Sequence, residues 1–201
     1  MYHIKICFLS ISLQIMIESF SLILLTAGKS ERMGIQKANL LLNGKSFYDI
    51  IISAYKKSNI TDQISVINYK LKTNERNTIN NSPEKGRLFS LQLGLKEMES
   101  DWYFIQNIDN PFVSAETLHK FINCKKEADI IQPIYYGKKG HPILISERVK
   151  QVILKETDYK LTLRDLFSKF SKQQIEVDDN TILTNINTPE DYKKYCIEKA
   201  S

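Results

Sequence analysis

The residues best suited to chemistry gather between Leu25 and Lys37, where two glycines and three cations stand close together. Glycines let the backbone approach a ligand closely, and backbone amides in such a loop can point at phosphate oxygens. Arg32 and Lys37 add positive charge that persists at neutral pH. The stretch is therefore interpreted as a triphosphate-binding loop, although glycines and cations alone are also typical of a solvated basic loop.

Two widespread phosphate motifs do not fit this stretch. A Walker A motif needs a glycine where the chain has Ile23, and a Rossmann fingerprint needs one where it has Ser30. The loop is therefore neither a P-loop nor a dinucleotide-binding turn.

Two further residues have side chains that suit catalysis or metal binding. Asp109 directly follows an apolar run and precedes Pro111, and its carboxylate is a ligand type that Mg²⁺ prefers. An aspartate before a turn is also a common turn former. His141 is one of three histidines, and alone it is as typical of a structural side chain as of a catalyst.

The elements that must position these residues alternate between strand-like and helix-like segments from residue 20 onward. This order favours an α/β fold with a mostly parallel, Rossmann-like sheet and helices on both faces. Ligands of such sheets bind beyond the carboxyl ends of the strands, which is where the Leu25 loop and Asp109 fall. The strands are expected at Phe20–Leu25, Ile64–Tyr69, Tyr103–Ile108, Ala128–Tyr135, Pro142–Ile145 and Gln174–Val177.

Helix starts are marked by capping residues. Ser46 with Asp49, and Thr162 with Asp165, are expected to cap two amphipathic helices. Thr188 can cap the last helix, in which Pro189 takes the first position. Other helices are expected after Ser114 and over Ser90–Met98, with Gly94 as a packing position, and Lys70–Gly86 is expected to be a long polar loop.

Composition excludes several classes of protein. The 201 residues carry 28 Lys and Arg against 23 Asp and Glu, a net charge of +5 that is too small to indicate a nucleic-acid partner. The three cysteines form no Cys-x-x-Cys pair, so neither zinc nor a disulfide framework is indicated and a cytoplasmic location is expected. Residues 1–17 are interpreted as an N-terminal extension and 18–201 as a single domain. No membrane association is expected, because the apolar run before Leu25 is interrupted by polar residues.

The Leu25–Lys37 stretch resembles the signature of the nucleotidyltransferase family that includes the molybdenum cofactor cytidylyl- and guanylyltransferases. The family pattern is Leu-Ala-Ala-Gly-x-Ser-x-Arg-Met-Gly-x-x-Lys, and only Thr26 departs from it. Later segments resemble other family elements in the same order: Gly86 with Ser90, Leu91 and Gly94; Asp109-Asn110-Pro111; Gly140-His141-Pro142 with Lys139 in place of an arginine; and Asn187-Thr188-Pro189-Glu190-Asp191.

The resemblance implies a nucleotide-diphospho-sugar transferase (GT-A-like) fold and a role for each matching residue. Arg32, Lys37 and Asp109 would be catalytic, Gly140 and His141 would bind the acceptor substrate, and Asp109 with Asn187 would hold Mg²⁺. The nucleotide would be bound by Leu25, Thr26, Ala27, Gly28, Lys29, Ser30, Arg32, Lys37, Gly86 and Ser90.

The implied reaction is the Mg²⁺-dependent transfer of CMP from CTP to molybdopterin, with release of pyrophosphate. CTP is favoured over GTP because Ala27 precedes Gly28, Gln36 precedes Lys37, and the Gly-His-Pro element is present. The implied partners are the nucleoside triphosphate, molybdopterin or molybdenum cofactor, and a molybdoenzyme.

Three alternatives stay open. The chain could be a guanylyltransferase or a sugar-phosphate nucleotidyltransferase of the same fold. It could also be a non-catalytic protein that binds and delivers molybdenum cofactor. Asn185 and Asn187 support this last alternative, because cytidylyl members often carry two aspartates at these positions.

Overall fold

The computed structural model describes residues 18–27, 33–68, 71, 73, 75–124 and 128–197. The extension 1–17 lies outside these described residues. So do four of the predicted nucleotide-binding residues: Gly28, Lys29, Ser30 and Arg32.

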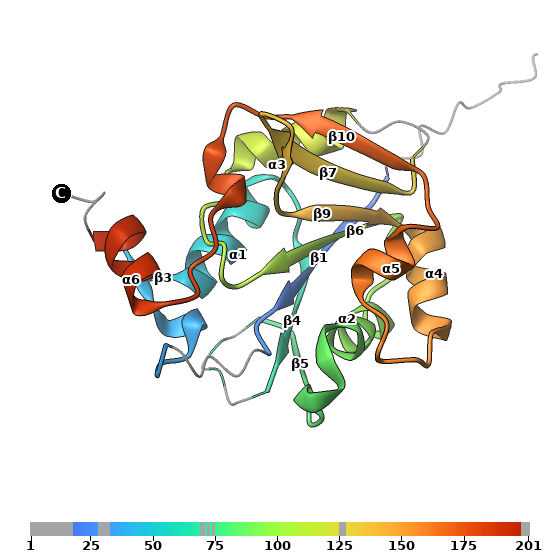
Figure 1. The fold of residues 1–201 in the computed structure, drawn as a ribbon, viewed down its shortest axis with the longest axis horizontal. Coiled ribbons are helices and arrows are strands. Elements are labelled where there is room, and N and C mark those ends of the chain that lie inside the picture. Colours follow the sequence, from blue (N-terminus) through green and yellow to red (C-terminus); the bar gives the residue numbers. More distant parts are fainter. Residues whose placement is uncertain are drawn as a thin grey trace, which may run out of the picture.

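An eight-stranded sheet forms the centre of the described part of the chain, with the strand order β10-β7-β9-β6-β1-β4-β5 and β8 paired with β7 (Figure 1). β1 is parallel to β4 and β6, and β4 to β5, so the carboxyl ends of these four strands share one edge. β9 is antiparallel to β6 and β7. The strands are β1 (Phe20–Leu25), β4 (Asp62–Ile67), β5 (Asn77–Ile79), β6 (Trp102–Asn107), β7 (Ile130–Tyr135), β8 (Lys138–Lys139), β9 (Ile143–Ser146) and β10 (Lys172–Glu176).

Helices cover both faces of the sheet, as the sequence predicts. Leu22 and Leu24 of β1 belong to the core cluster that includes α1 and α3, whereas Ile23 and Leu25 belong to the cluster of α2, α4 and α5. The alternation follows from the two-residue period of a strand that is buried on both faces. The helices are α1 (Phe47–Lys57), α2 (Gly86–Lys96), α3 (Ala115–Cys124), α4 (Glu147–Lys155), α5 (Leu163–Phe167) and α6 (Pro189–Tyr192).

Short elements complete the described part of the chain. The strands β2 (Leu41–Leu42) and β3 (Lys45–Ser46) form a separate antiparallel hairpin. Three single-turn 3₁₀ segments are η1 (Lys37–Asn39), η2 (Pro83–Lys85) and η3 (Asn180–Leu183), and α6 continues into the π-helical η4 (Lys193–Ile197).

The capping predictions are confirmed. The Ser46 hydroxyl accepts a hydrogen bond from the Asp49 amide at 3.0 Å. Thr162 with Asp165, and Thr188 with Asp191, form complete capping boxes. These helices begin at residues whose side-chain oxygens accept hydrogen bonds from the first backbone amides, which have no partner within the helix.

Three predictions about elements are wrong in part. The segment Lys70–Gly86 is not wholly a loop, because it contains β5 and η2. α2 begins at Gly86, four residues before the predicted start, and a positive φ of 83° at Gly86 lets the chain turn sharply into the helix. The sequence analysis also identified no helix at Glu147–Lys155, which is α4.

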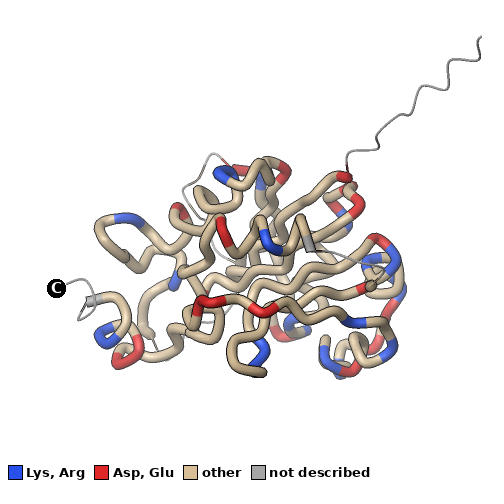
Figure 2. Tube along the Cα trace, turned by 90° about the horizontal axis from the view of Figure 1, so that it is seen from above, with Lys and Arg blue, Asp and Glu red and all other residues tan. Residues whose placement is uncertain are grey.

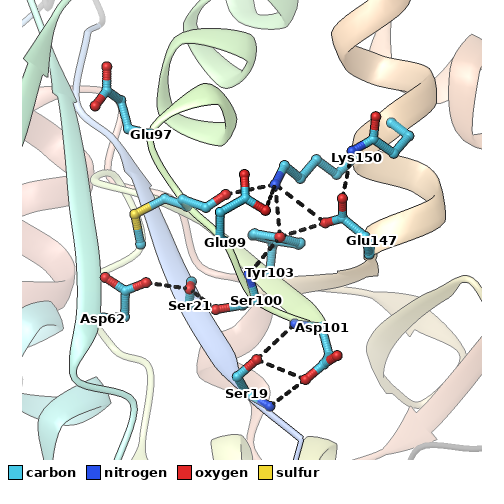
Figure 3. Close-up of polar contacts among 12 residues, drawn as sticks. Ser19, Ser21, Asp62, Glu97, Glu99, Ser100, Asp101, Tyr103, Glu147 and Lys150 are labelled. Atoms are coloured by element: carbon cyan, nitrogen blue, oxygen red, sulfur yellow. Dashed lines mark hydrogen bonds and ion pairs between the residues drawn. The ribbon is translucent and has the colours of Figure 1, made fainter.

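A buried polar network lies at the amino ends of β1 and β6, opposite the edge where the strands end (Figure 3). At its centre Lys150 of α4 is only 1% exposed. Its ammonium donates to the Met98 carbonyl at 2.7 Å and the Tyr103 hydroxyl at 3.0 Å, and forms ion pairs with Glu99 at 3.1 Å and Glu147 at 3.4 Å. The network ties α4 to the start of β6.

Basic and acidic residues are interspersed along the described part of the chain (Figure 2). Among the described residues, no helix is long and apolar enough to cross a membrane.

Candidate active site

Three segments that are far apart in the sequence bring Lys37, Asp109 and Asn187 together. The Lys37 ammonium donates to the Asn187 side-chain oxygen at 2.8 Å and lies 3.9 Å from a carboxylate oxygen of Asp109. Lys37 is the first residue of η1, Asp109 follows β6, and Asn187 precedes α6. The site therefore lies beyond the carboxyl end of β6, where an α/β sheet binds ligands.

Backbone and side-chain hydrogen bonds hold Asp109 and the segment before α6 in fixed positions. The Ile186 amide donates to the Asp109 carbonyl at 2.7 Å. Asn110, which is buried, donates through its side chain to the carbonyls of Thr181 and Ile182 at 3.1 and 3.3 Å. The loop after β6 is thereby joined to the loop after η3.

Asn187 precedes α6 but is not its cap. Thr188 is the cap, and the Asn187 amide instead donates to the Asp191 carboxylate at 3.0 Å. The Asn187 side chain is left to face Lys37, which favours a role in the site over a purely structural one.

Burial raises the pKa of the Asp109 carboxyl, while the positive charges of Lys37 and Arg87 oppose this and lower it. The net pKa lies above the usual aspartate value because the desolvation is the larger effect. One carboxylate oxygen, Oδ1, is buried and has no hydrogen-bond partner among the described residues. A buried oxygen without a partner is costly to maintain, and a bound cation would satisfy it.

Gly140 and His141 lie just before β9, which pairs with β6 on the side opposite β1, and they approach the same region from there. A Cβ atom on Gly140 would lie 2.6 Å from the Ile182 carbonyl oxygen, so only glycine fits this contact with η3. The His141 amide donates to that same carbonyl at 3.0 Å. Burial and the nearby charge of Arg87 lower the pKa of His141 to about 4, so its ring is neutral at physiological pH.

Apart from Lys37, the predicted nucleotide-binding residues that are described lie at the carboxyl end of β1 and in the first turns of α2. Leu25 ends β1, and its carbonyl accepts from the Ile108 amide at 3.1 Å, which places the start of the loop beside the Asp109 segment. The amide and hydroxyl of Thr26 both donate to the Val66 carbonyl, at 3.0 and 2.9 Å. The family pattern has alanine at this position. The Thr26 hydroxyl therefore adds a hydrogen bond that an alanine cannot make.

Ser90 and Gly94 have defined structural contacts in α2. The Ser90 hydroxyl accepts from the Asn80 side chain at 2.9 Å and donates to the Gly86 carbonyl at 3.3 Å. Gly94 is confirmed as a packing position, because a Cβ there would lie 2.6 Å from Ile23 of β1. Nucleotide contacts of Gly86 and Ser90 stay predictions.

Sequence reasoning missed Arg87 near this site and two asparagines at the same edge of the sheet. Arg87 follows Gly86 and acts electrostatically on both Asp109 and His141, and a cation beside a predicted phosphate-binding glycine was the available signal. Asn68 and Asn80 follow β4 and β5, at the same edge as the end of β1. The Asn68 side-chain oxygen is buried without a hydrogen-bond partner among the described residues. Polar residues directly after neighbouring parallel strands could have identified both.

A hollow of about 650 Å³ opens beside Asn187, between residues of η3, the loop before α6, α6 and η4. Most of its lining is polar, and it includes one cation and one aromatic ring. The lining residues are Asn180, Leu183, Thr184, Asn185, Asn187, Asp191, Lys194 and Tyr195.

Asp109 and Asn187 fit a hard divalent cation that keeps several non-protein ligands. Both offer oxygen atoms, which Mg²⁺ and Mn²⁺ prefer. No group of three or more His, Cys, Asp or Glu side chains able to hold a metal occurs among the described residues. Phosphate oxygens and water would therefore supply the remaining ligands.

An α/β sheet with a lysine, a partly buried carboxylate and an amide oxygen at its carboxyl edge is suited to binding phosphate groups together with a divalent cation. Residues 22–175 match the MobA-like NTP transferase domain, and the chain belongs to that family of nucleotidyltransferases.

Curated relatives cover nearly the whole chain. It is 28% identical over 203 residues to a probable molybdenum cofactor guanylyltransferase of Natranaerobius thermophilus, which covers 89% of this chain and 96% of the relative. It is 30% identical over 184 residues to one of Flavobacterium johnsoniae, covering 87% and 95%. It is 22% identical to the molybdenum cofactor cytidylyltransferase of Escherichia coli, covering 85% and 92%.

Solved structures confirm the GT-A-like fold. Rv0371c of Mycobacterium tuberculosis H37Rv, in a structure described as a complex with manganese, superposes with a TM-score of 0.71 at 16% identity, covering 89% of this chain and 98% of that one. Molybdopterin-guanine dinucleotide biosynthesis protein A of Archaeoglobus fulgidus superposes with a TM-score of 0.66 at 18% identity, covering 87% and 95%.

Proposed function

We propose that the protein transfers a nucleotidyl group from a nucleoside triphosphate to molybdopterin and releases pyrophosphate. The observation that carries the proposal is the meeting of Lys37, Asp109 and Asn187 at the carboxyl edge of the sheet. The names of the curated relatives support molybdopterin as the acceptor.

In the proposed reaction, a terminal phosphate oxygen of molybdopterin attacks the α-phosphorus of the triphosphate. A new diphosphate bond forms, the bond between the α- and β-phosphates breaks, and pyrophosphate leaves with the electron pair of that bond. Both reactants are anions, so charge neutralisation and in-line positioning account for most of the catalysis.

Each site residue has a proposed part in this positioning. Lys37 stabilises the charge that develops on the α-phosphate, and Arg32 holds the β- and γ-phosphates. Asp109 and Asn187 hold a divalent cation, taken to be Mg²⁺, which when bound neutralises phosphate charge. Neutral His141 can donate or accept a hydrogen bond to the acceptor without repelling a cation.

The polar hollow beside Asn187 suits the acceptor. The predicted nucleotide-binding residues Leu25, Thr26, Gly86 and Ser90 belong to β1, the loop after it and α2, whereas the hollow is lined by residues from η3 to η4. An acceptor held there would lie beside Asn187, whose side chain contacts Lys37. Asn180 and Asn185 offer amide groups that can hydrogen-bond to a polar ring.

The nucleotide has two candidates. Ala27, Gln36 and the Gly-His-Pro element favour CTP. GTP is favoured by the two relatives of 28% and 30% identity, both named as probable guanylyltransferases, against 22% for the cytidylyltransferase. The ratio of kcat/KM for CTP and GTP decides between them.

Pyrophosphate release in the presence of molybdopterin and Mg²⁺ or Mn²⁺ tests the proposal, with CTP, GTP, UTP and ATP compared. We expect release with CTP or GTP and its loss in Asp109→Asn. Asp178→Asn, at a fully exposed carboxylate, is the matched control and should behave as the wild type. Nucleotide binding without turnover would instead indicate a cofactor-delivery protein, and turnover with sugar phosphates a sugar-phosphate nucleotidyltransferase.

A further inference from the structure

The contact between Lys37 and Asn187 has a consequence for metal binding. The Lys37 ammonium lies 2.8 Å from the Asn187 oxygen and 3.9 Å from an Asp109 oxygen. These are the two side chains proposed above to hold a divalent cation. One positive group therefore already interacts with both.

The backbone at both oxygen donors is held by hydrogen bonds, whereas Lys37 carries its ammonium at the end of a long side chain. The Ile186 amide joins the Asn187 segment to the Asp109 carbonyl at 2.7 Å, and the Asp191 carboxylate fixes the Asn187 amide at 3.0 Å. Lys37 instead arrives from the short segment η1 on a flexible four-carbon side chain. Any change in the occupancy of the site should therefore move Lys37 rather than the donors.

A divalent cation and an ammonium repel one another strongly when both approach the same carboxylate in a partly buried site. Lys37 is 12% and Asp109 24% exposed, so water screens this repulsion only in part. Asn187 is neutral, so it adds no negative charge that could balance a second cation. Close binding of both cations at these oxygens is therefore unfavourable.

We propose that Lys37 and the divalent cation compete for Asp109 and Asn187, so that cation binding displaces the Lys37 ammonium from Asn187. The inference rests on the proposed function. The displaced ammonium then becomes available to the α-phosphate, which couples metal binding to the placement of Lys37. Without a metal, Lys37 neutralises Asp109 and limits the cost of its burial.

The labelling of Lys37 by an amine-reactive ester, measured by mass spectrometry during a Mn²⁺ titration, tests the competition directly. We expect labelling of Lys37 to rise several-fold and saturably with Mn²⁺, because the amine leaves its hydrogen bond. Asp109→Asn should abolish the rise. Lys56 serves as the internal control, because its ammonium donates to the Glu75 carboxylate at 2.7 Å and pairs with no described residue of the site. Its labelling should show no Mn²⁺ dependence.

Equilibrium dialysis of Mn²⁺ without nucleotide gives a second readout. Removing a competing cation should tighten Mn²⁺ binding, so Lys37→Met is expected to bind it about tenfold more tightly. Lys56→Met should match the wild type.

The failures of the two proposals are distinguishable. Mn²⁺ binding that depends on Asp109, with unchanged Lys37 labelling and unchanged affinity in Lys37→Met, would overturn the competition and leave the proposed function standing. Absence of both Mn²⁺ binding and pyrophosphate release, with either CTP or GTP, would overturn the proposed function and the competition with it.

Discussion

Replacing Lys150 by methionine tests whether the buried network at the amino ends of the strands stabilises the fold. Methionine keeps most of the length of the side chain, so the change removes the charge and its hydrogen bonds with little loss of volume. The Met98 carbonyl loses a charged donor at 2.7 Å, and the Tyr103 hydroxyl loses one at 3.0 Å. The variant therefore isolates the polar contacts of a residue that is 1% exposed.

The expected loss follows from these contacts. A hydrogen bond to a charged group contributes about 1.5 to 3 kcal/mol, and the ammonium makes two to uncharged acceptors. The ion pairs add less, because Glu147 is 39% and Glu99 86% exposed and both can be solvated after the change. The desolvation of the ammonium in the native state offsets part of the sum. We expect a net loss of about 3 kcal/mol in the free energy of unfolding.

Urea unfolding followed by circular dichroism measures this difference, with Lys155→Met on the same helix as the matched control. Lys155 is exposed, so its substitution should change the unfolding free energy by less than about 0.5 kcal/mol. For Lys150→Met the melting temperature should fall by roughly 6 to 12 °C for a chain of this size. Nucleotide binding should persist, because the network lies opposite the candidate site. A Lys150→Met variant as stable as the wild type would refute the reasoning. It would mean that the cost of desolvating the ammonium equals the free energy gained from its hydrogen bonds and ion pairs.

Burial lowers the pKa of Lys150, but the hydrogen bonds with Tyr103 and Glu99 outweigh it and the net pKa is raised. Stability from this group is therefore fully present below the usual lysine pKa, and is lost only as the pH rises through the raised value. The difference between wild type and Lys150→Met should stay constant across neutral pH and shrink in strongly alkaline solution.

Three further predictions concern the site and its support. Gly140→Ala should lower the melting temperature and the acceptor affinity together, because its Cβ would meet the Ile182 carbonyl oxygen at 2.6 Å, and calorimetry with a binding assay measures both. Gly94→Ala should cost about 1 to 2 kcal/mol in urea unfolding, since overpacking against β1 outweighs the gain in helix propensity; equal or greater stability would contradict the close packing. The folded-state pKa of His141, about 4, lies below the unfolded value near 6.5. Its contribution of about 3 kcal/mol should therefore be present above pH 6.5 and lost as the pH falls toward 4. A His141→Gln variant whose unfolding free energy keeps the wild-type pH slope would exclude this.

Much of the fold was predictable because it depends on local patterns. The apolar run Phe20–Leu25 forms the strand that it predicts, and Thr162 and Thr188 cap the helices that follow them. These signals act over a few residues, through strand burial and the first turn of a helix. β5 escaped prediction because Asn77–Ile79 is short, lies at a sheet edge and is mostly exposed, so it gives no apolar run.

The site was predictable in its residue types but not in its contacts. The similarity of Leu25–Lys37 and of Asp109-Asn110-Pro111 to a family signature identifies Lys37 and Asp109, since functional residues keep their local spacing. Arg87 was missed because its effect on Asp109 and His141 arises through space between different elements.

The sequence by itself determined the alternation of strands and helices, the starts of the capped helices α1, α5 and α6, and the stretch that carries the family signature. Only the tertiary structure decided that Lys37 meets Asn187, 150 positions away, and that Asp109 lies beside both. The physical reason is that this meeting depends on which strands become neighbours and on the hydrogen bonds that join the loop after η3 to the loop after β6. Such long-range pairing gives no local periodicity, so it becomes visible only when the chain has folded.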